Sequence, residues 1–317
     1  MLKALQFVKG SIASKGFDPT LMHFRIENGH IKGFNGSLAL SSPIELDLDV
    51  SPKAIPFVKA ITACKATTVM HVTPTGKLSI KSGKFKAFVE CAPDEAYPEI
   101  KPEGKIIPLK GSFIETLKKL QPFMAEDASR PWARGILLKG QSAFVTNNII
   151  IIEAWMERPF PVEVNIPASA IKELVRIKEE PTHIQLDERS ASFLYEDGRW
   201  LRTNLNTGEW PDITPVLNRE CDPKPLAEGF FEALIDIAPF AEETSMVMFI
   251  NGAICTHKDE GLGASAEVDG LPEEGAFNHK YLSKLEGLAE KIDLTLYPTP
   301  CIFYGDKLRG AIVGMKL

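Results

Sequence analysis

The chain has 317 residues, which is too long for one ordinary domain and fits two or three. Hydrophobic residues make up 44% and charged residues 25%, a balance that is typical of globular proteins and excludes collagen-like, coiled-coil and disordered chains. The longest run of large aliphatic residues, Ile149 to Ile152, is too short to span a bilayer. The first residues lack the sustained apolar stretch of a signal peptide, so we expect a cytoplasmic protein with no membrane partner.

The cysteines and histidines predict no cofactor and no metal site. The five cysteines are scattered without short spacings, which argues against a disulfide framework and against a cysteine-based zinc site. None of the six histidines has a second histidine two or four residues further on, as zinc motifs commonly do. The sequence also lacks a nucleophile elbow and a phosphate-binding loop, so no catalytic residue is predicted.

The net charge of -6 is distributed unevenly along the chain. Residues 1–104 carry 13 Lys/Arg and 10 Asp/Glu, a net +3, and residues 105–218 carry 14 and 15, a net -1. Residues 219–317 carry 9 and 17, a net -8, so the acidity belongs to the last third. Because attraction to phosphate acts over about 10 Å at ordinary salt, a basic surface elsewhere remains compatible with an acidic protein.

A hairpin pattern recurs near the end of each third of the chain. In each copy a β-rich run leads into a Ser-Gly, Asp-Gly or Gly-Asp turn and then into a second β-rich run. The three copies span residues 76–90, 190–202 and 301–313. This recurrence indicates an internal repeat.

Each hairpin follows a short amphipathic helix, and each third also opens with one, because apolar residues recur there at three-and-four spacing. The opening helices are expected at 2–13, 112–123 and 230–240, and the later helices at 52–63, 168–178 and 279–290. Ser51 and Pro52 form a suitable helix start, with Ile55, Val58 and Ile61 on the buried face. Between the helices we expect further strands, with Asn28-Gly29 and Asn251-Gly252 as tight hairpin turns.

The sequence therefore predicts an α+β fold made of three tandem copies of one domain, each with two helices packed on antiparallel sheets. One copy takes about 106 residues (317/3). The expected boundaries are 1–104, 105–218 and 219–317, with proline-rich linkers at 91–104 and 210–225.

At this level of detail the chain resembles the bacterial and bacteriophage sliding clamps, the beta subunit of DNA polymerase III. The resemblance covers essentially the whole length and depends on several short segments in the same order. These are the hairpin 76–90 followed by Ala-Pro-Asp-Glu-Ala-Tyr-Pro at 92–98, then 164–174, Gly-Glu-Trp-Pro-Asp at 208–212, 277–281 and the terminal 311–317.

The resemblance implies that the chain is half of a closed ring, a head-to-tail homodimer whose six domains encircle duplex DNA. Helices would line the hole and sheets would form the outer wall. Such a clamp has no enzymatic activity and contacts DNA independently of sequence. Its partners would be the replicative DNA polymerase, for which it acts as processivity factor, and the clamp loader.

The expected DNA-facing residues are cations on the polar faces of the predicted helices. A sliding surface must attract phosphates without reading bases, which lysine and arginine side chains achieve. We expect this role for Lys3, Lys53, Lys119, Lys172, Arg176 and Lys280. Ordinary solvated helix faces also carry lysines, so this alternative stays open. Glu232 and Asp236 lie opposite the apolar face of the third opening helix, so the last third is expected to contribute little to the DNA track.

The resemblance also implies an apolar pocket for short linear peptides of partner proteins. Related clamps commonly have Thr-Asp-Gly-His-Arg-Leu where this chain has Thr-Asn-Asn-Ile-Ile-Ile at 146–151, and end in Met-Pro-Met-Arg-Leu where this chain has Val-Gly-Met-Lys-Leu. The expected pocket residues are Thr146, Asn148, Ile149, Ile151, Val313, Met315 and Leu317. The alternative for Ile149 to Ile152 is a simple buried strand.

The ring-closing interface would join the first domain of one chain to the third domain of the other. By position, Ile107, Leu109 and Phe240 are candidates, although Phe240 is equally suited to the core. Three alternatives to a dimeric polymerase clamp stay open at this stage. They are a clamp-like scaffold that recruits repair or transcription proteins, a strand-rich enzyme with a dispersed site, and a trimer of two-domain chains.

Overall fold

Two Asn-Gly turns begin the sheets, as the sequence predicts. Asn28 and Gly29 both have positive φ, at 50° and 70°, and Asn251 and Gly252 have φ of 51° and 78°. This pair of left-handed residues matches the right-handed twist of the flanking strands, so each turn closes a two-residue hairpin.

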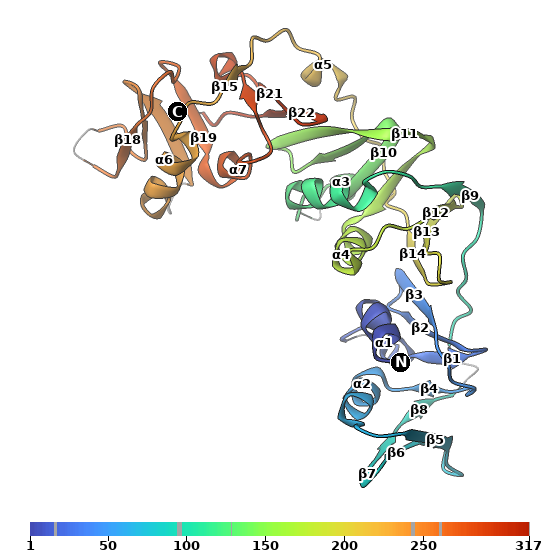
Figure 1. Cartoon of the computed structure of the whole chain (residues 1–317). Coiled ribbons are helices and arrows are strands. Elements are labelled where there is room, and N and C mark those ends of the chain that lie inside the picture. Colours follow the sequence, from blue (N-terminus) through green and yellow to red (C-terminus); the bar gives the residue numbers. More distant parts are fainter. Residues whose placement is uncertain (16–17, 94–96, 128, 242–244, 260–261, 317) are drawn as a thin grey trace. The chain divides into compact units, whose positions relative to one another are not determined.

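The computed structural model describes the chain except for residues 16–17, 94–96, 128, 242–244, 260–261 and 317. Its contacts divide the chain into two compact units, Met1–Ile114 with Ser169–Leu205 and Glu115–Ala168 with Asn206–Leu317. The predicted middle third is therefore shared between the units. Each unit combines antiparallel sheets with short helices (Figure 1).

The first unit contains a seven-stranded sheet, a three-stranded sheet and a two-stranded ladder. The large sheet has the order β1 (Arg25–Glu27), β2 (His30–Phe34), β3 (Leu38–Pro43), β14 (Trp200–Asn204), β13 (Ser190–Leu194), β12 (His183–Leu186) and β9 (Lys105–Pro108). The small sheet has the order β5 (Thr68–Val72), β6 (Leu78–Ser82) and β7 (Phe85–Val89), and β4 (Ser51–Pro52) pairs with β8 (Cys91–Ala92).

The helices of the first unit pack on these sheets through buried aromatic and aliphatic side chains. They are α1 (Leu2–Val8), continued by a 3₁₀ turn at Lys9–Ser11, then α2 (Ala54–Ala63) and most of α4 (Ala168–Ile177). Figure 1 shows α1 and α2 side by side, and the two helices are in contact. Phe24 and Phe57, both fully buried, meet edge to face at 6.3 Å between ring centroids.

The second unit contains a six-stranded and a four-stranded sheet. The first has the order β10 (Gly135–Thr146), β11 (Ile150–Pro167), β22 (Leu308–Ile312), β21 (Cys301–Gly305), β20 (Lys291–Ile292) and β15 (Lys224–Pro225). The second has the order β18 (Ser265–Glu267), β17 (Ala253–Cys255), β16 (Met246–Ile250) and β19 (Gly275–Asn278). The helices are most of α3 (Phe113–Leu120), α5 (Thr214–Leu217), α6 (Phe230–Ile237) and α7 (His279–Ser283). Phe230, Phe249 and Phe277 form a chain of ring contacts under α6.

Two strand pairs join sequence-distant parts of the chain into continuous sheets. In the first unit β3 pairs antiparallel with β14, and in the second unit β11 pairs antiparallel with β22. A β-carbon on Gly310 of β22 would lie 2.5 Å from the Ile151 carbonyl oxygen and 2.2 Å from the Phe303 ring. Only glycine permits so close an approach of three neighbouring strands.

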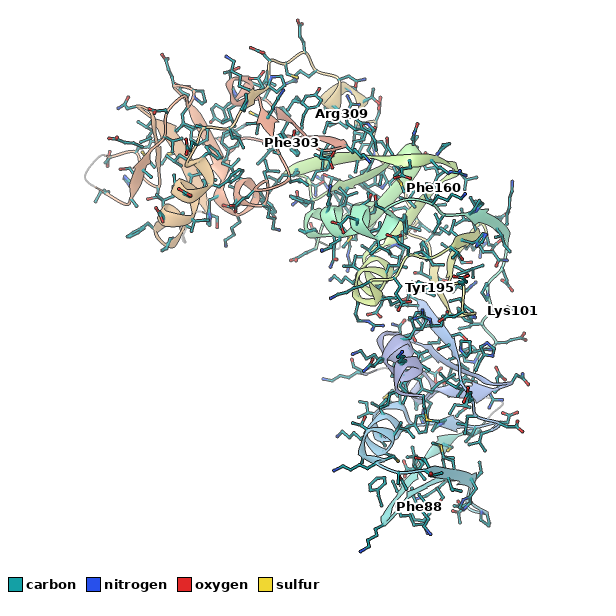
Figure 2. All side chains as sticks on the ribbon, viewed as in Figure 1. Phe88, Lys101, Phe160, Tyr195, Phe303 and Arg309 are labelled. Atoms are coloured by element: carbon teal, nitrogen blue, oxygen red, sulfur yellow. The ribbon has the colours of Figure 1, made fainter. Side chains whose placement is uncertain are left out.

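An ion pair between the buried Glu153 and the partly buried Arg309 crosses the β11–β22 junction (Figure 2 labels Arg309). Arg309 Nε lies 2.7 Å from Glu153 Oε2, and the Ser142 hydroxyl donates to Glu153 Oε1 at 2.6 Å. The same guanidinium donates to the Leu217 carbonyl and to Asn218 Oδ1, at the end of α5. Since Glu153 is only 8% exposed, these donors replace the water that its carboxylate loses on burial.

Several sequence predictions about the helices need correction. α2 begins at Ala54 after a Lys53 N-cap, whereas Ser51 lies in β4 and does not cap it. Ile55, expected on the buried face, is 62% exposed, because the helix turns the face of Ala54, Phe57 and Ile61 to the core instead. The helix expected at 279–290 ends at Ser283 and gives way to turns.

Replacing Arg309 with methionine should lower the free energy of unfolding by about 2–4 kcal/mol, because Glu153 would keep a buried charge without its cation. Replacing Glu153 with leucine and Arg309 with methionine together should cost less, since no unpaired charge remains. Urea unfolding at neutral pH measures both. The matched control is Arg158→Met, because Arg158 is exposed on β11, the strand that also carries Glu153. Its free energy of unfolding should stay within about 0.5 kcal/mol of that of the unmodified chain. A double variant that loses more than the single one would contradict the account.

Candidate nucleic-acid and partner-binding surfaces

Three of the predicted DNA-facing lysines are exposed. Lys3 lies on α1, Lys172 on α4 and Lys280 on α7, and no ion pair engages them within the described residues. Lys9 and Lys118 are also exposed, on the turn after α1 and on α3, and sequence reasoning missed both. Lys118 directly precedes the predicted Lys119, and this proximity is the signal that could have found it.

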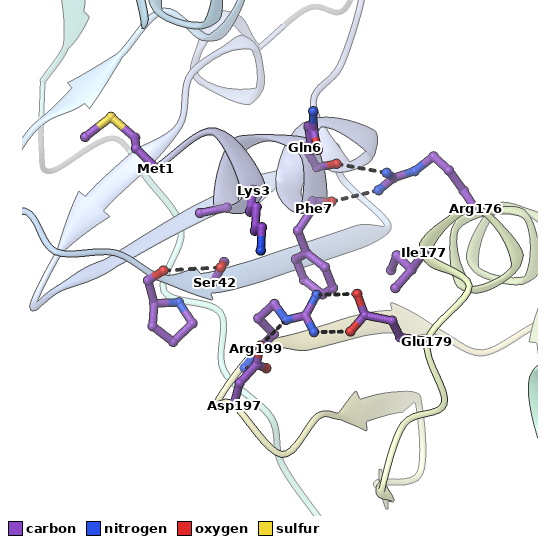
Figure 3. A pocket seen from close by; sticks show the side chains of 12 residues that line it. Met1, Lys3, Gln6, Phe7, Ser42, Arg176, Ile177, Glu179, Asp197 and Arg199 are labelled. Carbon is purple, nitrogen blue, oxygen red and sulfur yellow. Dashed lines mark hydrogen bonds and ion pairs between the residues drawn. The ribbon is translucent and has the colours of Figure 1, made fainter. Parts of the chain in front are cut away.

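Arg176 has a structural contact that the sequence did not reveal (Figure 3). Its guanidinium donates to the carbonyl oxygens of Gln6 at 2.8 Å and Phe7 at 2.7 Å, and pairs with Glu173 at 2.7 Å. Gln6 and Phe7 lie in the last turn of α1, where helix carbonyls lack partners within the helix. Arg176 therefore fastens α4 to the end of α1.

Two other predicted cations have mixed surroundings. Lys119 on α3 lies 3.5 Å from Asp306, and this pair is partly exposed. Lys53 is partly buried at the start of α2, where its backbone N–H donates to the Glu90 carbonyl at 2.8 Å. Both keep a positive charge near the surface, but neither is as open as Lys172.

The helices of the last third differ in charge from those of the first two. Glu232 and Asp236 are exposed on α6, as the sequence predicts. At the start of α7, burial and then the neighbouring Lys280 lower the pKa of His279, so its imidazole is neutral at pH 7. Lys280 therefore carries the positive charge at this helix start.

The β10–β11 turn is built by side-chain hydrogen bonds to the backbone. Thr146 Oγ1 donates to the Ile150 carbonyl and accepts from the Asn148 N–H, at 2.8 and 3.0 Å. Asn147 Oδ1 accepts from the N–H groups of Ile149 and Ile150. Asn148 has φ of 74°, a left-handed conformation that asparagine tolerates better than most residues. The turn thus holds Ile149 and Ile151 in a fixed place at the start of β11.

An apolar cluster lies on the same sheet. Its buried members are Leu217, Ile302 and Ala311, and Ile151 is one of the partly buried residues packed against it, with Phe144, Ile213 and Val216. A neighbouring pocket of about 320 Å³ is lined by Phe144, Ile213, Leu217, Trp210 and Arg309 among others. Of the predicted pocket residues, Ile151 contacts this cluster directly. Trp210 was not predicted, although its Gly-Glu-Trp-Pro-Asp segment was singled out.

The C-terminal segment continues the sheet beyond β22. The Val313 N–H donates to the Ile149 carbonyl at 2.8 Å, which brings these two predicted pocket residues together. The Met315 N–H donates to the Ala276 carbonyl, and the Tyr297 hydroxyl donates to the Met315 carbonyl at 2.8 Å. Val313 is 39% exposed and Met315 partly buried, whereas Leu317 lies outside the described residues.

A polar pocket of about 780 Å³ in the first unit was also not predicted (Figure 3). Arg199 lies over the rings of Phe7 and Tyr195, at 4.9 and 5.2 Å, and pairs with Glu179 and Asp197. The hydrogen bond with Glu179 raises the pKa of Arg199, which secures its charge. Because both carboxylates of the pocket are engaged by Arg199, the network is suited to holding α1 against the β13–β14 turn.

The predicted interface residues occupy different kinds of site. Ile107 is paired with Ile184 in the β9–β12 ladder, and the Leu109 N–H donates to the Thr182 carbonyl. Ile107 therefore lies in β9, the end strand of the seven-stranded sheet, and Leu109 follows directly after that strand, so their interface role stays a prediction. Phe240 is 64% exposed, so the core alternative for it is wrong.

Two strands at equivalent positions have an unpaired edge within the described part of the chain. β14 and β22, the last strands of the second and third hairpins, pair with β3 and β11. The corresponding strand of the first hairpin, β7, pairs only with β6. The strand of the last third that corresponds to β3 and β11 is β18, which pairs only with β17.

Metal-ligating side chains do not gather in groups of three or more within the described residues. No helix in the described ranges is long and apolar enough to cross a bilayer.

Solved structures resemble this chain over its whole length, whereas no protein-family profile and no curated protein sequence matches it. DNA polymerase III subunit beta from Pseudomonas aeruginosa is 19% identical with a TM-score of 0.82, and the match covers 100% of this chain and 97% of that one. The C. crescentus beta sliding clamp is 16% identical with a TM-score of 0.85 at the same coverage. The Helicobacter pylori beta clamp bound to a DNA ligase peptide is 15% identical with a TM-score of 0.82, again at 100% and 97%.

These likenesses confirm the predicted fold. The chain has the sliding-clamp fold, of mixed helix and antiparallel sheet, from end to end. The match includes nearly the full length of each compared chain, so this chain spans the whole clamp architecture.

Replacing Arg176 with alanine should lower the free energy of unfolding by about 2 kcal/mol, because the Gln6 and Phe7 carbonyls lose a charged donor. Lysine at this position should restore only part of the loss, since an ammonium cannot reproduce the planar fork. Lys172→Ala, an exposed change on the same helix, is the matched control and should have almost no effect. Thermal or urea unfolding distinguishes these outcomes. Equal stability of the Arg176 and Lys172 variants would refute the structural role.

Proposed function

We propose that this chain is a DNA sliding clamp, a cytoplasmic processivity factor without enzymatic activity that encircles duplex DNA and tethers a replicative DNA polymerase. The observation that carries the proposal is the clamp fold over the entire chain, matched across 97% of the compared clamps. A protein that holds DNA by encircling it needs no base-specific contacts, only a diffuse attraction to phosphates. The exposed lysines on short helices are consistent with that requirement.

The repeat organisation supports a head-to-tail homodimer with three domains per chain. β14, the last strand of the second repeat, pairs with β3 of the first repeat, and β22, the last strand of the third repeat, pairs with β11 of the second. By the same rule β7, the last strand of the first repeat, would pair with β18 of a third repeat. Such a pair can form only between two copies of the chain. We therefore assign ring closure to the pairing of β7 of one copy with β18 of the next. Boundaries near residues 104 and 218 agree with this rule.

The β18 edge assigned to ring closure presents backbone hydrogen-bonding groups. The Thr256 N–H donates to the Ala264 carbonyl and the Val268 N–H to the Gly252 carbonyl. Since antiparallel pairs alternate, the backbone groups of Ser265 and Glu267 point away from β17, toward the open edge. The charges also match, because residues 1–104 carry a net +3 and residues 219–317 a net -8.

For the DNA track we propose the exposed lysines Lys3, Lys172 and Lys280, and we add Lys9 and Lys118. Lys53 and Lys119 stay predictions. We assign Arg176 a positioning role, because its guanidinium is engaged by two carbonyls and a carboxylate.

For the partner site we propose the surface formed by the β10–β11 turn, the cluster around Ile302 and the C-terminal segment. The predicted residues Thr146, Asn148, Ile149, Ile151, Val313 and Met315 all come from these three parts. A linear peptide of a polymerase or clamp loader would place apolar side chains there. The bound DNA ligase peptide of the H. pylori clamp supports a peptide site on this fold.

Charge reversal at Lys3, Lys172 and Lys280 should reduce the retention of the loaded protein on closed circular DNA. The unmodified protein should stay on a circle and leave a linear duplex within the same time, because only a circle is topologically linked to a ring. Retention after gel filtration measures both. Reversal of Lys224 and Lys291, exposed lysines on β15 and β20, is the matched control and should leave retention unchanged. Equal retention of the protein on circular and linear DNA would contradict the clamp proposal.

Ser265→Pro should weaken the dimer without unfolding the chain. Proline removes the N–H that points to the open edge of β18 and leaves the Ile254–Ala266 pairing intact. Losing one backbone hydrogen bond per interface, with the strand edge disturbed, should weaken association about ten-fold. Sedimentation equilibrium compares it with Ser265→Ala, which keeps the N–H and should associate like the unmodified chain. A proline variant that is fully dimeric would remove β18 from the interface.

A further inference from the structure

The exposed face of the β5–β6–β7 sheet combines lysines with an aromatic side chain. Strand register places Val69, Lys81 and Lys86 in one row across the three strands. The next row consists of His71 and Phe88, both exposed, with the buried Ser79 between them. Because side chains two residues apart share a face, both rows lie on the same side of the sheet. The opposite side is core, with Leu78, Ile80 and Val89 buried.

The segment that forms this sheet carries an unbalanced positive charge, and two of its lysines lie on the face itself. Residues 65–90 contain five lysines and a single acidic residue, Glu90. Lys81 and Lys86 are direct cross-strand partners, and both are exposed. Like charges in that position destabilise a sheet. Within the described residues, no carboxylate pairs with Lys65, Lys77, Lys81, Lys84 or Lys86, whereas Lys32, Lys101 and Lys139 are all paired.

An aromatic ring lies open beside these lysines. Phe88 is 55% exposed on β7, and the Lys86 ammonium lies 4.7 Å from its ring centroid (Figure 2). Val69, 59% exposed, lies on the other edge strand of the same face. Phe88 and Val69 thus expose apolar surface on a face that also carries Lys81 and Lys86, a combination that suits a ligand with both negative charge and flat apolar surface.

We propose that this face binds single-stranded nucleic acid without sequence preference. Lysines along β6 and β7 would contact the phosphates, and bases would stack on Phe88. Single-stranded nucleic acids combine a charged backbone with exposed ring faces, and an aromatic platform in a basic groove is the surface that binds them. An acidic peptide would satisfy the lysines but would offer no base to stack on Phe88.

The proposal goes beyond the clamp function and does not depend on it. In the proposed clamp, helices would face the duplex. The surface described here is instead the solvent side of the β5–β6–β7 sheet, whose other side packs on α2. Ring closure would use the backbone edge of β7, not its face. Lys81 lies on the middle strand, which is paired along both edges, so it reports on the face alone.

The test measures fluorescence anisotropy of a labelled oligothymidylate of about 10 nucleotides with the full chain over a range of salt concentrations. We expect Phe88→Ala to weaken binding about ten-fold, and Phe88→Trp to retain it. Replacing Lys81 and Lys86 with alanine should reduce the slope of log affinity against log salt by about 1.4, which is about 0.7 for each phosphate contact. Lys81→Ala alone should reduce it by about half of that.

The matched control removes the same charge elsewhere, with Lys224 and Lys291 changed to alanine, and should bind like the unmodified chain. Polyglutamate, added as a competitor of the oligonucleotide, tests whether an acidic peptide is the true ligand. The proposal is overturned if the chain does not bind the oligonucleotide, or if the Lys81 and Lys86 changes leave the salt slope unaltered. It is equally overturned if polyglutamate binds as tightly and Phe88→Ala has no effect.

Discussion

Antiparallel pairing at strand edges is the constraint on which the rest of this molecule depends. Every edge strand presents a row of N–H and C=O groups that must meet water or another strand. Here β14 covers the edge of β3 and β22 covers the edge of β11, so sheets run on from one repeat into the next. The Arg309–Glu153 pair and the missing side chain of Gly310 lie at one such joint, where strands approach most closely. A chain built on this rule necessarily ends with one unmatched strand of each kind.

The distribution of charge fits the same arrangement. The exposed lysines of α1, α4 and α7 lie on helices, whereas the joints between repeats lie in the sheets. Electrostatic attraction to phosphates acts over about 10 Å at ordinary salt, so the net -8 of the last third does not cancel the cations of α1 and α4. By the proposed pairing rule, the acidic last third would meet the basic first third of a second copy.

Local signals in the sequence predicted local structure well. The Asn28-Gly29 and Asn251-Gly252 turns and the repeated hairpins are confirmed, because two-residue turns depend on the backbone preferences of the residues in them. Helix ends and buried faces were harder to predict. Ile55 and Phe57 both suit an inward position on α2, and only the shape of the surrounding core decides that Phe57 is buried.

Contacts between distant segments were beyond sequence reasoning. Arg176 was predicted to face DNA because it is a cation on a polar helix face, but the carbonyls that it binds are some 170 residues away in the chain. The same is true of Lys119 and Asp306. Ile107 and Leu109 were placed by their distance from the first hairpin, whereas β9 takes its partner, β12, from a segment far ahead. The sequence predicts pairings between distant segments only where an internal repeat shows which segments correspond.

The β10–β11 turn, part of the proposed partner surface, separates backbone shape from side-chain chemistry. Asn147 accepts two backbone N–H groups and Asn148 adopts a φ of 74°, so the two asparagines satisfy the backbone of the turn where the sequence resemblance implies Asp-Gly. The residues that follow are isoleucines where the same resemblance implies a histidine and an arginine. Backbone geometry and side-chain charge are therefore separable at this site. A peptide that fits this chain would meet more apolar surface and less positive charge, so its affinity should depend more on buried area and less on salt.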